Sequence, residues 1–407
     1  MLNFAKFIFS RMLLDSDKLR FALPRMFPPS DPKLSAIRMK NFISTYLAWK
    51  YGLKLKTKPI ILQIEPVKGC NLNCVMCGAG QIRIQKLPFD DFKMIIDKFP
   101  EAMFINLFYL GEPFLSKDTL KMIRYAQGKS IVVIFSNFTV LPDPEDVVNS
   151  GLFEIHASID SFDKQKYNFI RKAGDINQII NKMMSDIENF ETDEKEKMKA
   201  GFEELYQEAL RNQLIKNKYE YENMNGNTLD IVVKNLKSLV EARKKLRKKL
   251  PIISINSVYA KETKEDAEDI IKNAIELGVD RVKFQRLHHD IPGVLHVPDM
   301  NDLQYIIELK KKYKGQIKIS IMNFDFRGDH PKGYCYFAYF MSVIHVDKKI
   351  FPCCMPYPYM DIYKSLLGTV GSEEEISRAL EKRQKLIWSF RGSPPSFCLK
   401  CPLYFRR

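Results

Sequence analysis

Three cysteines stand within eight residues, directly after a stretch that predicts a buried strand. The strand is the apolar run 59–67 (PIILQIEPV), and Cys70, Cys74 and Cys77 follow it. Three thiolates spaced C-x3-C-x2-C in one short loop can bind three irons of a cubane cluster, which leaves the fourth iron without a protein ligand. A structural zinc site needs four protein ligands, and no fourth cysteine or histidine lies close by. The spacing therefore favours an iron–sulfur cluster with an open coordination position.

Strand and helix patterns alternate along residues 59–325. The stretches between the predicted strands show helical periodicity, as in 116–127 and 264–277. Such alternation is typical of a parallel sheet with helical crossovers, closed partly or wholly into a barrel. Reactive groups then lie at the carboxyl ends of the strands. The six predicted strands are 59–67, 104–108, 131–135, 153–159, 252–258 and 281–287.

Three segments fall outside this alternation. Residues 1–58 form a basic arm with twelve basic and three acidic side chains, and so carry most of the net charge of +15. This distribution argues against a nucleic-acid-binding surface on the core. Residues 190–250 are rich in Glu and Lys and predict a helical insertion before the fifth strand. In residues 326–407 proline, cysteine and aromatic residues increase, which predicts a second, smaller metal-binding domain.

Short polar motifs follow the second, third and fourth predicted strands. They are Leu110-Gly111-Glu112-Pro113, then Ser136-Asn137, then Ser158-Ile159-Asp160 with Arg171 further on. Each motif alone is weak evidence, since it could be an ordinary turn or helix cap. Their occurrence at successive strand ends makes coincidence improbable. A carboxylate such as that of Glu112, beside backbone carbonyls, is suited to a cation.

Together with the cysteine loop, these motifs resemble the radical S-adenosylmethionine (radical SAM) superfamily, over about residues 59–190 and 251–290. The resemblance implies a partial (β/α)6 barrel and a 4Fe-4S cluster bound by Cys70, Cys74 and Cys77. The amino and carboxylate groups of S-adenosylmethionine would chelate its open iron. Met76, Leu110 and Phe138 depart from the family pattern, which often has an aromatic residue at the first position and glycines at the other two.

The resemblance also implies roles for the motif residues. Glu112 and its neighbours are expected to bind the amino group of the cofactor, and Ser158 and Arg171 its carboxylate. The full set of expected cofactor-binding residues is Gly111, Glu112, Pro113, Ser136, Asn137, Ser158, Asp160 and Arg171.

The remaining five cysteines all lie beyond residue 334. A turn at 347–349 predicts a hairpin that would bring Cys353 back toward Cys335. Four thiolates without an open position would suit a closed zinc site or a fully ligated iron–sulfur cluster equally well. The tail resembles the twitch or SPASM extension of radical SAM enzymes, which implies one auxiliary 4Fe-4S cluster. Its expected ligands are Cys335, Cys353, Cys398 and Cys401, with Cys354 as the alternative to Cys353.

Two further segments have open interpretations. His288 and His289 follow the sixth predicted strand and are candidate catalytic residues, because imidazole can move a proton near neutral pH. A loop that caps the barrel mouth explains them equally well. Apolar and basic residues in 2–20 could rest on an anionic bilayer or form a helix packed on the barrel. We find no secretory signal and no membrane-spanning window, and expect a cytoplasmic protein with or without membrane contact.

The resemblance implies an enzyme that receives an electron from an external donor such as flavodoxin or ferredoxin. Cleavage of S-adenosylmethionine would yield a 5′-deoxyadenosyl radical that abstracts hydrogen from a substrate carbon. The substrate class is a peptide, a sugar or another small metabolite, and the auxiliary cluster suits either a net oxidation or a structural role. The alternative is a non-catalytic iron–sulfur or zinc protein that uses the arm and the insertion as interaction surfaces.

Overall fold

A computed structural model describes residues 19–172, 228–288, 290–291, 293–322, 335–353, 365–390 and 392–398. Its centre is one large sheet, in the strand order β12-β11-β10-β1-β4-β5-β6-β7-β8-β9. All six predicted strands occur in it as parallel neighbours in chain order, so the α/β fold class is confirmed. They are β1 (Ile61–Ile64), β4 (Phe104–Leu107), β5 (Ile131–Ser136), β6 (Glu154–Ser158), β7 (Ile252–Tyr259) and β8 (Arg281–Arg286).

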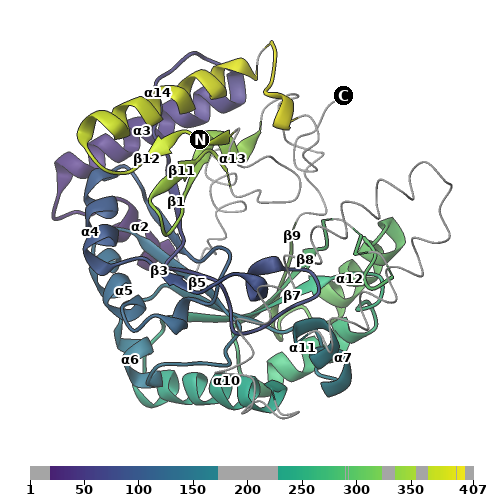
Figure 1. The fold of residues 1–407 in the computed structure, drawn as a ribbon. Coiled ribbons are helices and arrows are strands. Elements are labelled where there is room, and N and C mark those ends of the chain that lie inside the picture. The colour runs from purple at the N-terminus through teal and green to yellow at the C-terminus, as the bar shows by residue number, and fades with distance from the viewer. Residues whose placement is uncertain are drawn as a thin grey trace, which may run out of the picture.

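Helices cover the outer side of this curved sheet (Figure 1). The side chains that face them are apolar, because alternate residues of a strand point to opposite faces. In β6, Ile155 and Ala157 are fully buried in the outer core, whereas Glu154 and His156 lie on the inner face. The covering helices are α4 (Phe89–Lys98), α5 (Thr119–Gln127), α6 (Pro144–Asn149), α7 (Lys164–Lys172), α10 (Thr228–Lys245), α11 (Asp266–Leu277) and α12 (Met300–Lys312).

Two of these helices begin later than their periodicity predicted. The pattern over 116–127 becomes α5 only from Thr119, whose hydroxyl donates to the Pro113 carbonyl at 2.6 Å. The pattern over 264–277 becomes α11 from Asp266, and it ends at Gly278 in the left-handed region (φ 73°). The core of each helix is as predicted, and the ends are set by local turns.

Helix α10 is the described part of the predicted insertion. It packs on α6 and α7 and buries Leu229, Val232, Leu236 and Leu239. Because it leads directly into β7, this part of the 190–250 segment is a crossover helix of the barrel. The rest of the insertion lies outside the described residues.

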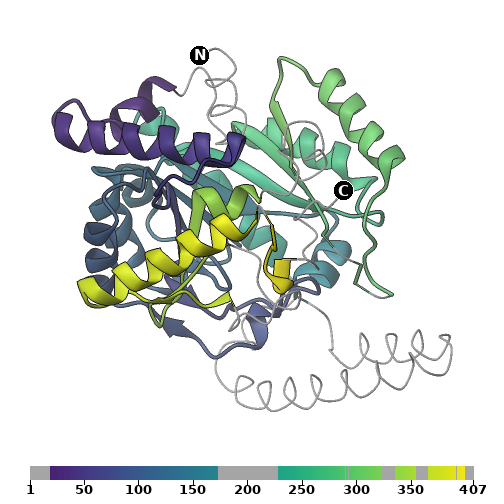
Figure 2. The same ribbon diagram turned by 90° about the horizontal axis from the view of Figure 1, so that it is seen from above.

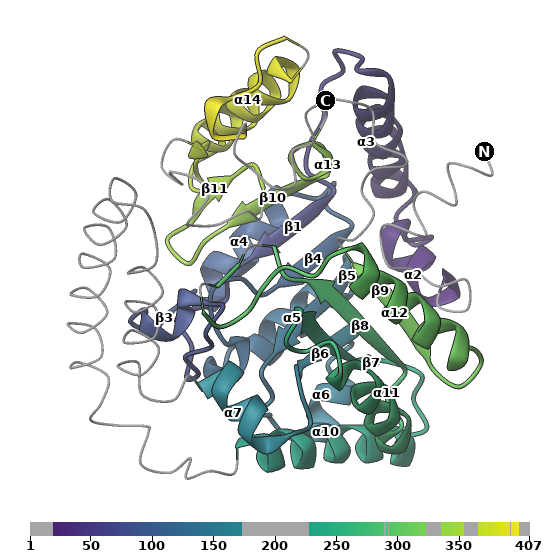
Figure 3. The same ribbon diagram turned by 90° about the vertical axis from the view of Figure 1, so that its right-hand side faces the viewer.

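The main sheet extends beyond the six predicted strands at both edges. β9 (Lys318–Met322) continues it parallel to β8, and β10 (Met341–Ile344) lies parallel to β1. The predicted tail hairpin is confirmed as β10 paired with β11 (Lys349–Phe351), followed by β12 (Gly368–Thr369). Figure 3 shows β10 and β11 beside β1, so the tail continues the main sheet. The tail also contains α13 (Tyr336–Phe340) and α14 (Glu373–Ser389), and a separate small ladder joins β2 (Val67–Lys68) to β3 (Gln85–Lys86).

The described part of the basic arm forms α2 (Leu19–Met26) and α3 (Pro32–Tyr51), both packed on the barrel. Arg38 of α3 is buried and donates to the backbone carbonyls of Pro100 and Ala102 at 2.8 and 2.9 Å. These contacts attach α3 to the start of β4. The segment 2–13, on which the two interpretations of the arm depend, lies outside the described residues. In the part of the chain that is described, no helix is long and apolar enough to cross a membrane.

Candidate active site

The cysteine loop and the Gly-Glu-Pro loop are joined by a short parallel bridge. The Gly69 amide donates to the Leu110 carbonyl at 2.8 Å, and the Glu112 amide donates to the Gly69 carbonyl at 3.2 Å. A Cβ atom at Gly111 would lie 2.1 Å from the Val67 carbonyl oxygen, so no side chain fits there. The glycine of the second motif is therefore required by the close approach of two backbones.

The three cysteines lie on a loop that closes on itself. The Cys70 amide donates to the Ala79 carbonyl at 3.1 Å, and the Cys77 amide to the Cys74 carbonyl at 3.0 Å. Burial raises the pKa of the Cys70 thiol and raises that of Cys74 to about 12. A bound metal cation favours the thiolate form, so the donor set fits thiolate ligation of iron.

Glu112 presents a buried carboxylate beside this loop. Its Oε1 accepts from the Phe114 amide at 3.2 Å and the Ser136 hydroxyl at 2.8 Å, and its Oε2 accepts from the Asn137 amide at 2.7 Å. Burial raises its pKa to about 7, although these hydrogen bonds oppose the rise. Within the described residues no cation pairs with it. A carboxylate in this state is suited to a ligand's ammonium group.

Asn137 connects the third motif to the first. Its side-chain amide donates to Asn71 Oδ1 at 2.9 Å and to Cys70 Sγ at 3.4 Å. Thr139 completes the network, because its hydroxyl donates to Asn137 Oδ1 at 2.7 Å and accepts from Asn71 Nδ2 at 2.8 Å. Asn71 and Thr139 were missed in the sequence, although each is a polar residue within two positions of a motif residue.

The fourth motif forms a buried ion pair. Arg171 Nε lies 2.6 Å from Asp160 Oδ2, and Asp160 Oδ1 accepts from the Val258 amide at 2.7 Å. Burial opposes the charge of Arg171, but Asp160 and then Cys74 raise its pKa above the ordinary value. Arg171 therefore lies between Asp160 and the cysteine loop. Ser158 is half-buried at the end of β6.

Among the described residues, one buried hydroxyl near the cysteine loop makes no hydrogen bond. Tyr167 of α7 is fully buried, and its Oη makes no hydrogen bond to any described atom. Burial raises the pKa of this phenol, while Arg171, Cys74 and Asp160 are its strongest electrostatic neighbours. An unpaired donor at this position fits a site that receives a polar ligand.

Two residues near the second motif have structural contacts. Pro113 begins a short 3-10 helix, and its carbonyl accepts from the Thr119 side chain. Glu65, which no sequence motif indicated, directly follows β1, has no exposed surface and accepts from the Leu110 and Val346 amides at 3.3 Å each. Burial raises its pKa to about 7. The sequence signal for Glu65 was an acidic residue inside the apolar run 59–67.

The inner face of the barrel carries a charged cluster. Lys283 Nζ lies 2.9 Å from Glu154 Oε1 and 3.1 Å from His156 Nε2, and Arg281 Nη1 lies 3.4 Å from Glu154. Burial alone would raise the pKa of Glu154, but Lys283 and the other cations lower it to about 2. Burial lowers the pKa of Lys283 to about 8. The His156 ring is fully buried and stacks on Phe135 with the ring centroids 4.0 Å apart.

Of the two predicted catalytic histidines, only His288 lies within the described residues. His288 is half-buried directly after β8, and His289 lies outside the described residues. The neighbouring Asp290 accepts from the Val297 amide at 2.6 Å and so fastens its own loop. A proton-transfer role for either histidine stays a prediction.

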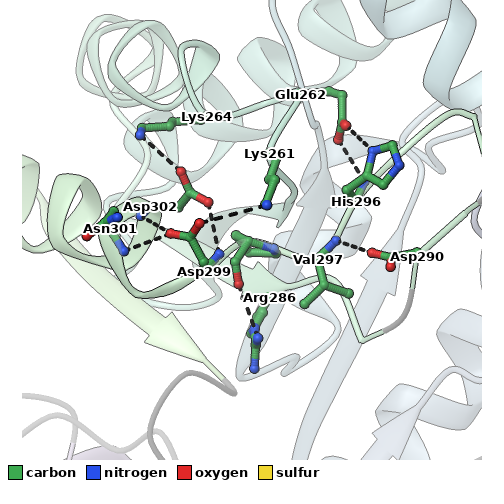
Figure 4. A network of polar contacts seen from close by, with 11 residues as sticks. Lys261, Glu262, Lys264, Arg286, Asp290, His296, Val297, Asp299, Asn301 and Asp302 are labelled. Carbon is green, nitrogen blue, oxygen red and sulfur yellow. Dashed lines mark hydrogen bonds and ion pairs between the residues drawn. The ribbon is translucent and has the colours of Figure 1, made fainter.

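Polar contacts fasten the rim loops that follow β7 and β8 (Figure 4). Glu262 pairs with the His296 ring at 2.5 Å and accepts from the His296 amide at 2.8 Å. Arg286 donates to the Pro298 carbonyl at 3.1 Å. The contact with Glu262, which the sequence did not indicate, shows that His296 connects the two loops.

The tail cysteines occupy separate elements. Cys335 precedes α13, Cys353 follows β11, and Cys398 ends a 3-10 turn and is buried in an apolar cluster that Cys335 also contacts. Cys401 and Cys354 lie outside the described residues. Among the residues described, no group of three His, Cys, Asp or Glu side chains is placed to bind a single metal ion. The auxiliary cluster stays a prediction.

No family model matches the chain. Among curated proteins, GTP 3′,8-cyclase of Clostridium botulinum is 26% identical over 142 residues. That match covers 32% of this chain and 43% of the cyclase, so the chain spans less than half the length of the curated relatives it matches.

Solved structures share the fold. SuiB of Streptococcus suis bound to S-adenosylmethionine superposes over 90% of this chain and 74% of its own, with 14% identity and a TM-score of 0.54. SuiB bound to its precursor peptide SuiA gives the same TM-score, with 15% identity and the same coverage. Native anSMEcpe with bound AdoMet covers 85% of this chain and 88% of its own, with 16% identity and a TM-score of 0.51. The resemblance to radical SAM enzymes is thus confirmed at the level of the fold.

Proposed function

We propose that this chain is a radical SAM enzyme that modifies a peptide. The observation that supports it best is the hydrogen-bonded network joining Cys70, Glu112 and Asn137, since three motifs far apart in the sequence meet there. When bound, the 4Fe-4S cluster and S-adenosylmethionine would supply reductive cleavage of the cofactor to methionine and a 5′-deoxyadenosyl radical that abstracts hydrogen from a substrate carbon.

The cysteine loop would bind the cluster through the thiolates of Cys70, Cys74 and Cys77. The Leu72 amide at 3.3 Å and the Asn137 side chain at 3.4 Å donate to the sulfur of Cys70. Hydrogen bonds to a ligating sulfur stabilise negative charge on it and so raise the reduction potential of a cluster. These two donors would therefore tune the centre that receives the electron from an external one-electron donor.

Two buried charges would orient the methionine part of the cofactor. Glu112 would accept from the amino group, which supplies the cation that the buried carboxylate lacks. Arg171 is already fixed by Asp160 through Nε, and its remaining N–H groups would donate to the carboxylate. Ser158, Ser136, Gly111 and Pro113 complete the proposed pocket.

A structural neighbour supports the choice of a peptide substrate. SuiB has been solved with a precursor peptide, and this chain has its fold. Glu154, His156 and Lys283 are buried on the inner face and pair with one another, so they are treated as structural rather than as substrate contacts. Cys335, Cys353, Cys398 and Cys401 would ligate one auxiliary cluster, as an electron acceptor or a structural centre.

Cofactor binding tests this function directly. In anaerobically reconstituted protein, Arg171→Lys should weaken S-adenosylmethionine binding by about tenfold, because lysine cannot reproduce the planar donor fork. Equilibrium dialysis with labelled cofactor measures this, and cluster absorbance should be unchanged. Arg243→Lys is the matched control, since Arg243 of α10 is also buried and pairs with Asp280, a partly exposed residue just before β8.

Two outcomes would contradict the proposal. Equal losses of affinity in both arginine variants would mean that the effect is structural. Wild-type protein with a full cluster that binds no S-adenosylmethionine, and that forms no 5′-deoxyadenosine with a chemical reductant, would instead support a non-catalytic iron–sulfur protein.

A further inference from the structure

Exposed apolar side chains gather on the basic arm. In the described residues nine large apolar side chains are exposed, and six of them lie between residues 19 and 58. Single exposed apolar residues are ordinary on protein surfaces, whereas a contiguous group marks an interaction surface. The six are Leu23, Ile37, Met39, Ile43, Tyr51 and Leu53, between 40% and 65% exposed.

Helix α3 has a face buried on the barrel and an opposite face that carries apolar side chains between lysines. The inner face follows the spacing Arg38, Phe42, Thr45, Trp49 and is buried on the barrel. The outer face follows the same three-and-four spacing through Ala36, Lys40, Ile43, Leu47 and Lys50. Large apolar side chains that stay exposed beside lysines on one helix face suit an interface with a partly apolar, anionic surface. Here the outer face is turned away from the barrel, and α3 lies along the outer edge of the molecule (Figure 2).

The charged side chains on and beside this face of α3 are lysines, so its charge is positive. Lys33, Lys40 and Lys50 are exposed on α3, and Lys54 and Lys56 follow it. None of these five lysines forms an ion pair within the described chain. The one acidic residue between 19 and 58 is Asp31, whose carboxylate is engaged in capping the Leu34 amide. The face therefore offers apolar side chains set among uncompensated positive charges, the complement of an anionic bilayer.

We propose that the outward face of α2 and α3 docks on an anionic lipid membrane, a property beyond the proposed catalytic function. Ile43 and Leu47 would enter the boundary between headgroups and acyl chains, and the flanking lysines would remain at the headgroups. The surface thus combines apolar burial with positive charge, as stable peripheral binding requires.

Co-sedimentation of the full-length protein with vesicles tests the proposal. We expect binding to vesicles of phosphatidylcholine mixed with phosphatidylglycerol, weaker binding in added salt, and little binding to phosphatidylcholine alone. Changing Lys33, Lys40 and Lys50 together to Gln should lower the partition coefficient by about fivefold per lysine. Ile43→Glu should lower it by about tenfold or more.

Matched changes on α12 separate a specific surface from general charge. Met300 is 62% exposed, and Lys310, Lys311 and Lys314 are exposed near it in sequence on α12 and the turn after it. Met300→Glu and the triple change of these lysines to Gln should leave vesicle binding within about twofold of wild type. Equal losses in the α3 and α12 variants would overturn the proposal.

Other occupants of the face give different results. A dimer in light scattering that Ile43→Glu converts to monomer, without vesicle binding by the wild type, would assign the face to a second copy. Loss of binding on deletion of residues 1–18, with wild-type binding by the α3 variants, would place the contact upstream and overturn the proposal. A longer deletion is unsuitable, because Ala22 and Met26 of α2 are buried and the Met26 carbonyl accepts from Arg38 at 3.1 Å.

Discussion

Replacing Glu112 by Gln removes the buried carboxylate at the centre of the proposed cofactor pocket. Its pKa rises from an ordinary 4.5 to about 7 through burial. Each pH unit of such a rise corresponds to about 1.4 kcal/mol, so the ionised carboxylate costs the folded protein about 3 kcal/mol above neutral pH. The side chain is 2% exposed, and solvent screening reduces this figure little.

The sign of the pH dependence follows from the direction of the shift. Below about pH 4.5 the carboxyl is protonated in both the folded and the unfolded chain, and no cost arises. As the pH rises through 7, the folded state must release a proton that the unfolded state released earlier. The contribution of Glu112 to the free energy of unfolding therefore declines between about pH 4.5 and about pH 7, and it is constant above that range.

The assay is urea unfolding of cofactor-free wild-type and Glu112→Gln protein at about pH 5 and about pH 8. The wild type should lose about 3 kcal/mol more than the variant between these conditions. Glu65→Gln is the matched control, because Glu65 is also buried and burial also raises its pKa to about 7. Both variants should flatten the stability profile, but only Glu112→Gln should weaken S-adenosylmethionine binding.

Two results would refute the reasoning. A Glu112→Gln protein with the same pH dependence as wild type would show that the carboxylate is not ionised at a cost in the folded state. Equal effects of the two variants on cofactor affinity would show that Glu112 has no special place in the pocket.

Three further predictions concern the clusters and their surroundings. Changing Cys70, Cys74 and Cys77 to Ala should remove about half of roughly eight irons per chain; an iron assay that finds no loss, or stoichiometric zinc in the tail, would contradict the two-cluster proposal. Tyr167→Phe should stabilise the cofactor-free protein by about 1 kcal/mol, because its buried hydroxyl has no described partner, and should weaken cofactor binding; unchanged affinity in dialysis would mean that the hydroxyl meets no ligand. Cys398→Ser should preserve 5′-deoxyadenosine formation and suppress oxidised product if the auxiliary cluster accepts electrons, whereas product at the wild-type rate would exclude any role for that cluster.

The barrel itself was predictable because its signals are local. Six apolar runs became β1 and β4–β8 in chain order, since a buried parallel strand needs a continuous apolar run and its crossover needs an amphipathic helix. The cysteine spacing and the three strand-end motifs were likewise visible as short patterns. The neighbours within the site were less visible, because Asn71 and Thr139 lie near motif residues without belonging to any pattern.

The sequence alone determined the order of strands, the composition of the cysteine loop and the positions of the motifs, because spacing and periodicity depend on a few adjacent residues. Only the tertiary structure decided which of these segments meet. The Gly69–Gly111 bridge, the placement of β10 beside β1 and the joining of Glu65 to the tail depend on contacts between segments distant in the chain. It also decided that α3 turns Trp49 inward and Ile43 outward, since both faces of that helix carry large apolar side chains and only the surface it packs on distinguishes them.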